Sequence, residues 1–324
     1  MKKYLIRRLL EVIPILLFIS ILIFVILNAM PGDALLQMRM ENPRAFANDP
    51  AALEKLRAHY GLDQPVYVRY GVWLGKMLQG DLGYSSTYRV PVLNLLKSRI
   101  PNTLFLTITA WLIGLVVALP IGIYSAIKKY SAFDFLATGF AFVGISLPHF
   151  WFALMAIIVF SVHLGWLPIS GMSSYGLTGT WEIFLDRFRH LILPACILGF
   201  VQVAYWVRYI RTALIEVMNM DYIRTAYSKG ITRKKVIFKH ALKNALIPII
   251  TILALDIPYF FGGAVIVETV FSWPGMGRLM YQAVLGSDHN LAINCLIFLA
   301  LITLLSNLMA DFLYAFVDPR IRYN

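Results

Sequence analysis

The sequence predicts an all-α integral membrane protein with six transmembrane helices and a small helical insertion after the first helix. Hydrophobic residues make up 59% of the 324 residues, charged residues only 14%, and the mean hydropathy is +0.71. So little polar surface cannot cover an ordinary soluble domain. Long apolar runs recur along the chain, and lysines and arginines gather in the short segments between them, as in the loops of membrane proteins.

The first apolar run, at about residues 9–30, follows a basic start made of Lys2, Lys3, Arg7 and Arg8. A cleaved signal peptide has the same arrangement. This run is longer than the apolar core of such a peptide, and the sequence NAMPGD at its end offers no convincing small-x-small cleavage site. We therefore expect residues 1–30 to form an N-terminal tail and a retained transmembrane helix.

The long segment at 31–99 is expected to form a small extracytoplasmic helical cap. Apolar residues recur at helical spacing within it, at Leu53 and Leu56 and again at Tyr70, Trp73, Leu74, Met77 and Leu78. Gly61 and Gly80 stand where such helices would end. The segment is therefore predicted to be structured rather than a flexible linker.

Five further spans, within a core at 100–324, are expected at about 101–127, 134–163, 190–218, 245–270 and 290–317. All must be helical, because lipid offers the backbone no other hydrogen-bond partner. Prolines lie inside these runs or near their ends, at Pro120, Pro148, Pro194, Pro248 and Pro258. Kinked helices are therefore expected instead of a straight bundle.

The charges of the short loops predict the orientation. With six spans, the N-terminus, the turn at Lys128 and Lys129, the loop at 219–244 and the C-terminal tail fall on one side. Basic short loops mark the cytoplasmic side, and the opposite loops at 164–189 and 271–289 carry fewer basic residues. Lys97 and Arg99 are a mild exception to this rule, because they lie close to a span on the opposite side. Both termini are therefore expected in the cytoplasm.

Several chemistries lack support in the sequence. The net charge of +12 sits in membrane loops, which indicates a lipid surface and no nucleic-acid partner. No G-x-x-x-x-G-K-[ST] phosphate loop is present. Cys196 and Cys295 lie in apolar runs and are expected to be buried packing residues, and His149 and His163 lack the i, i+4 spacing of a helical metal site. We therefore expect neither a metal site nor catalytic residues.

The basic loop DYIRTAYSKGITRKKVIFKHALKN, residues 221–244, is the most informative segment. Gly230 divides it into two pieces, each with apolar residues at helical spacing. A nucleic-acid-binding helix-turn-helix is disfavoured because membrane spans flank the loop. A loop held on anionic lipid and a helix that docks on a cytosolic partner both fit these residues, and the residues alone do not separate them.

The same loop carries a family resemblance. RTAYSKG resembles the E-A-A-x-x-x-G loop of ABC importer permeases, with Arg224, Thr225, Ala226 and Gly230 at the matching positions. The following HALKNALIP, which begins with His240, Ala241 and Leu242, resembles the second half of the loop in the peptide branch. Arg224 replaces the glutamate of the pattern, and Pro248 lies later than the general pattern expects.

Five further motifs extend the resemblance from end to end. The chain is similar to the oligopeptide/dipeptide permease family, in the subunit with the long first outer loop, through MPGD (30–33), YGLDQPVYVRY (60–70), GDLGYS (80–85), GGAVIVETVFSWPGMGRL (262–279) and DFLYAFVDPRIRY (311–323). The resemblance implies the type I ABC importer permease fold. It also implies a subunit of a bacterial or archaeal plasma-membrane importer that forms half of a peptide pathway.

The partners are implied in the same way. They are a second homologous permease subunit, two cytosolic ATPase subunits that bind ATP and Mg, and an extracytoplasmic peptide-binding protein. This chain would bind no cofactor and would not be an enzyme. Import of nickel, glutathione or another small solute is the alternative within the family. A self-contained secondary carrier is a further alternative, although it predicts inverted repeats that the sequence does not display.

Ionisable and polar residues within the spans are candidates for the pathway. Asp256 lies in the middle of its run and shares a helical face with Tyr259, although a capped or helix-interface carboxylate fits equally well. Gln202 and Tyr205 are expected to share a face of the fourth span. Glu268 lies in the GGAVIVETVFSWPGMGRL motif and is a candidate for an outer gate.

Overall fold

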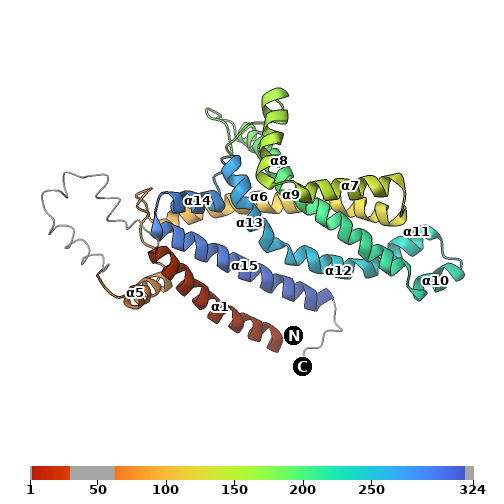
Figure 1. Ribbon diagram of the computed structural model, residues 1–324, viewed down its shortest axis with the longest axis horizontal. Helices are drawn as coiled ribbons and strands as arrows, with labels where there is room; N and C mark the ends of the chain where they lie inside the picture. Colours follow the sequence, from red (N-terminus) through yellow and green to blue (C-terminus); the bar gives the residue numbers. More distant parts are fainter. Residues whose placement is uncertain (1, 30–62, 318–324) are drawn as a thin grey trace.

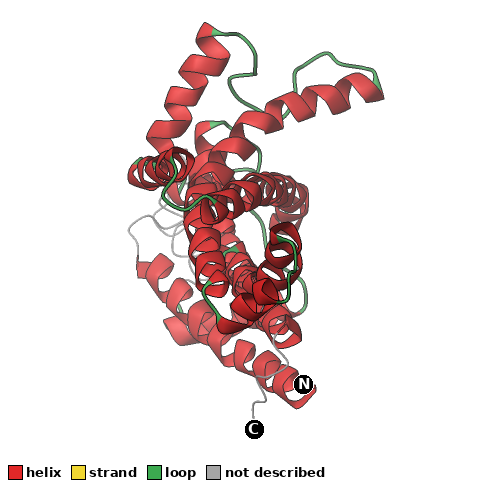
Figure 2. Cartoon of the chain, turned by 90° about the vertical axis from the view of Figure 1, so that its right-hand side faces the viewer, coloured by secondary structure: helices red, strands yellow, loops and turns green. Residues whose placement is uncertain are grey.

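The computed structural model describes residues 2–29 and 63–317, which fold almost entirely into helices (Figure 1). Within these ranges no strand forms, and the sole bridge joins Tyr84 to Pro91. Figure 2 shows the same arrangement end on, with helices packed side by side along the long axis. The predicted all-α class is confirmed.

The helices follow one another in the order of the apolar runs. They are α1 (Lys2–Ala29), α5 (Val66–Leu78), α6 (Val92–Ile127), α7 (Ala132–Ser146), α8 (His149–Ala156), the π-helical η1 (Ile157–His163), α9 (Thr180–Met218), α10 (Asp221–Ser228), α11 (Arg233–Lys235), the π-helical η2 (Val236–Ala241), α12 (Leu242–Leu255), α13 (Ile257–Val270), α14 (Met276–Leu285) and α15 (His289–Val317).

Four helices of the described ranges, α1, α6, α9 and α15, are long and apolar enough to cross a membrane. The predicted span at 134–163 is instead a pair, α7 followed by α8 and η1, that bends by 106°. The predicted span at 245–270 is also broken, into two helices of 14 residues on either side of Asp256. The six expected segments are therefore four continuous helices and two broken ones.

Two of the five prolines explain these breaks. Pro148 is the N-cap of α8, and Pro258 lies in the first turn of α13, where its missing N–H costs no helical hydrogen bond. Figure 1 shows α13 turning away from the end of α12. Pro120, Pro194 and Pro248 lie inside α6, α9 and α12 without interrupting them. Kinking was thus correctly expected, but only two prolines cause a break.

Helices α6 and α9 form the most extensive helix pair of the core. A row of buried small residues runs along α6 at intervals of four, made of Ala110, Gly114, Ala118, Gly122 and Ala126. A Cβ atom added to Gly122 would lie 2.8 Å from Ile210 of α9, and one added to Gly199 of α9 would lie 2.7 Å from the Ala110 carbonyl oxygen. Small residues therefore allow these two backbones to approach closely.

An ion pair fastens α7 to the same helix. The Arg211 guanidinium donates to both carboxylate oxygens of Asp134, through Nε at 2.5 Å and Nη2 at 2.7 Å. Asp134 also accepts the Tyr130 backbone N–H and lies almost completely out of solvent. Such a bidentate pair fixes the orientation of both side chains. Helices α6, α7 and α9 thus form one closely connected group.

At the opposite end, α5 lies on α1. Tyr70 and Trp73 of α5 each place their ring 5.5 Å from that of Phe24, and the Tyr70 hydroxyl bonds Ser20. The predicted helix in this part of the cap is confirmed, and Gly80, at φ +83°, follows its end. Leu53, Leu56 and Gly61 lie outside the described residues. Residues 92–99 of the expected cap begin the long helix α6.

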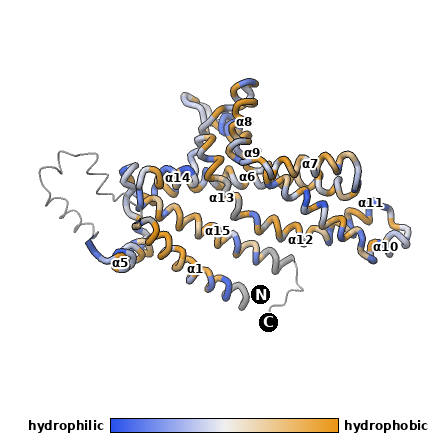
Figure 3. Tube along the Cα trace, in the orientation of Figure 1, coloured by the Kyte–Doolittle hydropathy of each residue, from blue (hydrophilic) through white to orange (hydrophobic). Residues whose placement is uncertain are grey.

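Large apolar side chains cover much of the outer surface. Figure 3 shows mostly hydrophobic colouring along α1, α6 and α15. Phe18, Val116 and Phe140 are each more than 60% exposed. A water-soluble protein rarely presents such extended apolar faces, so lipid or a partner helix must cover them.

Candidate coupling loop and pathway residues

Helix α9 leads directly into the basic loop at one end of the molecule (Figure 1). It ends at Met218, α10 follows, and Gly230 then adopts φ +73°. No atom lies within 4 Å of the position that a Cβ would take at Gly230, so the turn requires glycine for its backbone conformation and not for space. The predicted division of the loop into two helical pieces at Gly230 is confirmed.

The inner side of α10 packs on the second piece of the loop. Ile223 and Ala226 are buried, as are Val236, Ile237 and Ala241 of η2. The two pieces are also tied by the Asn244 side-chain amide, which donates to the Tyr222 hydroxyl at 2.9 Å. The loop is therefore a compact helical hairpin.

The opposite side of α10 faces solvent. Arg224 and Thr225 are exposed, and Arg224 is paired only loosely with Asp221 at 3.4 Å. His240 and Leu242 are partly buried. The seven residues of the loop motif therefore divide into an inner group around Ala226 and Ala241, and an outer group that includes Arg224 and Thr225. The outer group is available to a partner.

Asp256 lies at the break between α12 and α13. One of its carboxylate oxygens accepts a 2.5 Å hydrogen bond from the indole N–H of Trp206 in α9. The indole N–H of Trp111 in α6 donates to the Leu253 carbonyl oxygen at 3.3 Å, and the Trp111 and Trp206 rings meet edge to face. Two tryptophans thus fasten the broken helix to the α6–α9 pair. Asp256 stays partly exposed.

The other candidate pathway residues lie in different surroundings. Gln202 is buried, one turn before Trp206, whereas Tyr205 is 44% exposed and stacks on Tyr209. Three residues advance a helix by about 300°, so the two side chains point about 60° apart. Gln202 and Tyr205 thus lie on neighbouring parts of the helix surface, but only Gln202 reaches the buried side. Tyr259 belongs to α13, but its side chain is outside the described part of the structure.

Glu268 is fully buried between three helices. Its carboxylate accepts the Thr103 hydroxyl of α6 at 2.6 Å and the Arg278 backbone N–H of α14 at 2.9 Å. Thr103 in turn accepts the Met276 backbone N–H at 2.7 Å. A carboxylate from α13 thereby caps the first turn of α14, where unpaired N–H groups attract negative charge. Glu268 is therefore not exposed on the surface of this chain, where a residue that forms an outer gate by itself would lie.

The described residues hold no group of three or more His, Cys, Asp or Glu side chains that could bind a metal ion. His149 and His163 lie at the start of α8 and the end of η1. Cys295 is buried as expected, but Cys196 is exposed on α9. The expectation for Cys196 is wrong because an apolar face of a membrane helix can point outward as well as inward.

Comparison with known sequences identifies the family. Residues 118–323 match the binding-protein-dependent transport system inner membrane component, and residues 1–107 match the N-terminal part of such membrane components. The chain belongs to this permease family. It is 44% identical to the oligopeptide transport system permease protein AppB of Bacillus subtilis (strain 168) over the full length of both chains. It is 37% identical to the dipeptide transport system permease protein DppB of Escherichia coli (strain K12), covering 100% of this chain and 99% of that one.

A solved structure shows the same fold. The inward-facing MetNI methionine ABC transporter matches 70% of this permease and covers 97% of its own chain, with a TM-score of 0.58 and 17% sequence identity. This match confirms the type I ABC importer permease fold, and the two relatives above confirm the peptide permease branch. At this identity the structural match supports the fold alone.

The geometry gives the family motifs a physical role. In this permease the GDLGYS segment is held against α15, because the Asn290 amide donates to the Leu82 and Tyr84 carbonyl oxygens, and Asp288 accepts the Ser85 hydroxyl. The WPG turn between α13 and α14 is held against α6 in the same manner by Asn102, which bonds the Pro274 carbonyl oxygen. These motifs join segments that lie far apart in the sequence.

Proposed function

We propose that this chain is a permease subunit of an ATP-driven importer of dipeptides or oligopeptides, and that it forms half of the translocation pathway. One observation carries the proposal. The loop between α9 and α12 is a compact helical hairpin with a buried inner side and a basic outer side, at one end of the helices, in a chain 44% identical to an oligopeptide permease. A helix of this kind can seat in a groove of a cytosolic partner.

The packing supplies a route for the movement. Helix α10 continues from α9, which is joined to α6 by small residues and to α7 by the Asp134–Arg211 pair. Rotation of α10 by an attached ATPase would therefore turn these three helices together as a rigid body. The two tryptophan hydrogen bonds would pass that rotation to the break at Asp256.

The remaining partners follow from this role. ATP and Mg would bind to two cytosolic ATPase subunits, a second permease subunit would complete the pathway, and an extracytoplasmic binding protein would deliver the peptide. The basic loop would lie in the cytoplasm, because basic short loops mark that side. The start of α1 and the end of α15, which are joined by Arg8 and Asp311 at 3.4 Å, would lie on the same side. The chain itself would carry out no chemical step.

The test is reconstitution of the chain with its second permease, ATPases and binding protein in liposomes. We expect uptake of labelled di- or oligopeptide that requires ATP and every subunit. Uptake of nickel or glutathione without peptide uptake would show that the transporter imports another of the solutes carried by this family. Uptake by the chain alone would overturn the proposal in favour of a secondary carrier.

A further inference from the structure

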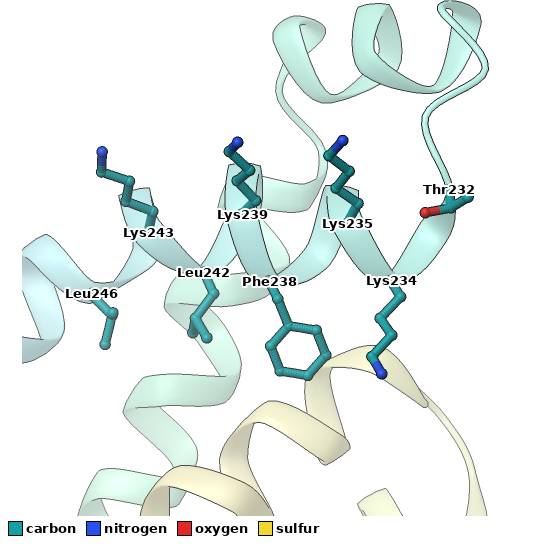
Figure 4. Close-up of a pocket in the computed structure, with 8 residues that line it drawn as sticks. All are labelled: Thr232, Lys234, Lys235, Phe238, Lys239, Leu242, Lys243 and Leu246. Atoms are coloured by element: carbon teal, nitrogen blue, oxygen red, sulfur yellow. The ribbon is translucent and has the colours of Figure 1, made fainter.

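The second half of the basic loop and the start of α12 carry an open groove of about 630 Å³ (Figure 4). Four lysines border it, Lys234, Lys235, Lys239 and Lys243. Phe238, Leu242 and Leu246 provide most of its apolar lining. We call this surface the lysine groove. It is separate from the outer face of α10, which the proposed function assigns to the ATPase.

The side chains of the lysine groove form two rows. Figure 4 shows Lys235, Lys239 and Lys243 on one side of the helix, and Lys234, Phe238, Leu242 and Leu246 on the other. Both rows have a spacing of four residues, which places their members one above another along the helix. In the second row, Lys234 comes first and three apolar side chains follow, so that the whole row from Lys234 to Leu246 is about 18 Å long at 1.5 Å per residue.

The charges of the groove are not balanced within the described part of the chain. Within residues 2–29 and 63–317 these four lysines form no ion pair, and Asp221 and Asp256 are the acidic residues nearest to the groove in sequence. Phe238, one turn after Lys234 on the same side of the helix, is 52% exposed. An exposed aromatic ring next to an ammonium group without an ion pair is an incomplete surface that an anionic and partly apolar ligand would complete.

The order of the residues distinguishes between ligands. An acidic protein surface or a nucleic acid would match the lysines but would leave the row from Phe238 to Leu246 uncovered. A phospholipid has an anionic head and an apolar tail, in the same order as Lys234 followed by Phe238, Leu242 and Leu246. The apolar end of the row continues into the apolar helix α12, the first half of the broken segment at 242–270, along which an acyl chain would lie.

We propose that the lysine groove binds one anionic phospholipid, with its phosphate at Lys234 and an acyl chain along Phe238, Leu242 and Leu246. The lipid would hold η2, whose Val236 and Ile237 are buried beside Ile223 of α10. The position of the coupling helix would thus depend on lipid charge. This proposal rests on the proposed function in one respect, which is that the loop lies at the cytoplasmic surface of the membrane.

The experiment measures retained lipid directly and needs no transport substrate. The complete transporter is purified in nanodiscs of equal parts phosphatidylglycerol and phosphatidylcholine, released into detergent, and examined by native mass spectrometry. The test variant is Lys234→Glu, which changes the net charge by two, as the control does. The matched control is Lys128→Gln with Lys129→Gln, two exposed lysines at the turn between α6 and α7. A third variant, Phe238→Ser, tests the apolar row.

We expect the test variant to retain phosphatidylglycerol about tenfold less than the wild type, and the control to retain it unchanged. Phe238→Ser should also lower retention. Equal retention in test variant and wild type, or an equal loss in test and control variants, would overturn the proposal. Loss of the ATPase subunits with unchanged lipid would show that the groove binds an acidic protein surface instead. None of these readouts depends on peptide import, so failure of the proposed function would be seen separately.

Discussion

At the scale of single residues, the buried carboxylate of Glu268 joins three helices. It accepts hydrogen bonds from Thr103 of α6 and from the backbone of α14. Glu268→Ala would leave these donors buried and unpaired, and each such group costs about 1–3 kcal/mol. We expect a loss of about 3 kcal/mol in stability, measured as a lowered melting temperature in detergent. Glu268→Gln keeps an acceptor oxygen and should lose less, and equal melting of Glu268→Ala and wild type would contradict the capping role.

Asp256 offers a second test at the residue scale. Asp256→Asn removes the charge but keeps an oxygen that can accept from the Trp206 indole. If the carboxylate contacts the solute, uptake should fall about tenfold while the melting temperature and subunit assembly stay unchanged. Trp206→Phe is the complementary change, because it removes the hydrogen bond and keeps the ring near Trp111 and Phe260. A loss of stability in Asp256→Asn equal to that in Trp206→Phe would indicate a purely structural carboxylate.

At the scale of helices, the α6–α9 contact depends on the absence of side chains. Gly122→Ala would place a methyl group 2.8 Å from Ile210 and 3.0 Å from the Val207 carbonyl oxygen. We expect destabilisation of about 1–3 kcal/mol from overpacking, seen as a lowered melting temperature. Gly139→Ala in α7 is the matched control, since no atom lies within 4 Å of the added methyl group. An unchanged melting temperature for Gly122→Ala would show that the helices can move apart without cost.

The helices could be predicted from the sequence because the apolar runs are long enough to lie in lipid. The backbone N–H and C=O groups of such a run have no partner in lipid except each other, and a helix pairs them all. The breaks were only partly predictable. Five prolines look alike in the sequence, but only Pro148 and Pro258 lie at the start of a new helix, whereas the other three lie inside continuous helices. The row from Ala110 to Ala126 was visible as a four-residue repeat, but its partner helix was not. The Trp206–Asp256 bond joins residues 50 positions apart, which no local pattern reveals.

At the scale of the whole molecule, the basic loop and α5 lie at opposite ends of the long axis (Figure 1). Gly230 and Gly80 provide a matched pair of positions there. Both have positive φ, +73° and +83°, and neither has an atom within 4 Å of an added Cβ. A β-branched residue is strained at either position by about the same amount. The two substitutions therefore differ in location and not in the local cost.

This pair separates coupling from stability. In the reconstituted transporter, Gly230→Val should distort the turn between α10 and α11, so that ATP hydrolysis continues while peptide uptake falls about tenfold. Gly80→Val should destabilise the chain to the same extent but leave the ratio of peptide taken up to ATP hydrolysed unchanged. The measurement is that ratio, determined in fully assembled complexes. A normal ratio in Gly230→Val would mean that the movement of the ATPases does not pass through this loop, and the contact between α9 and the break at Asp256 would then lose its role in transmission.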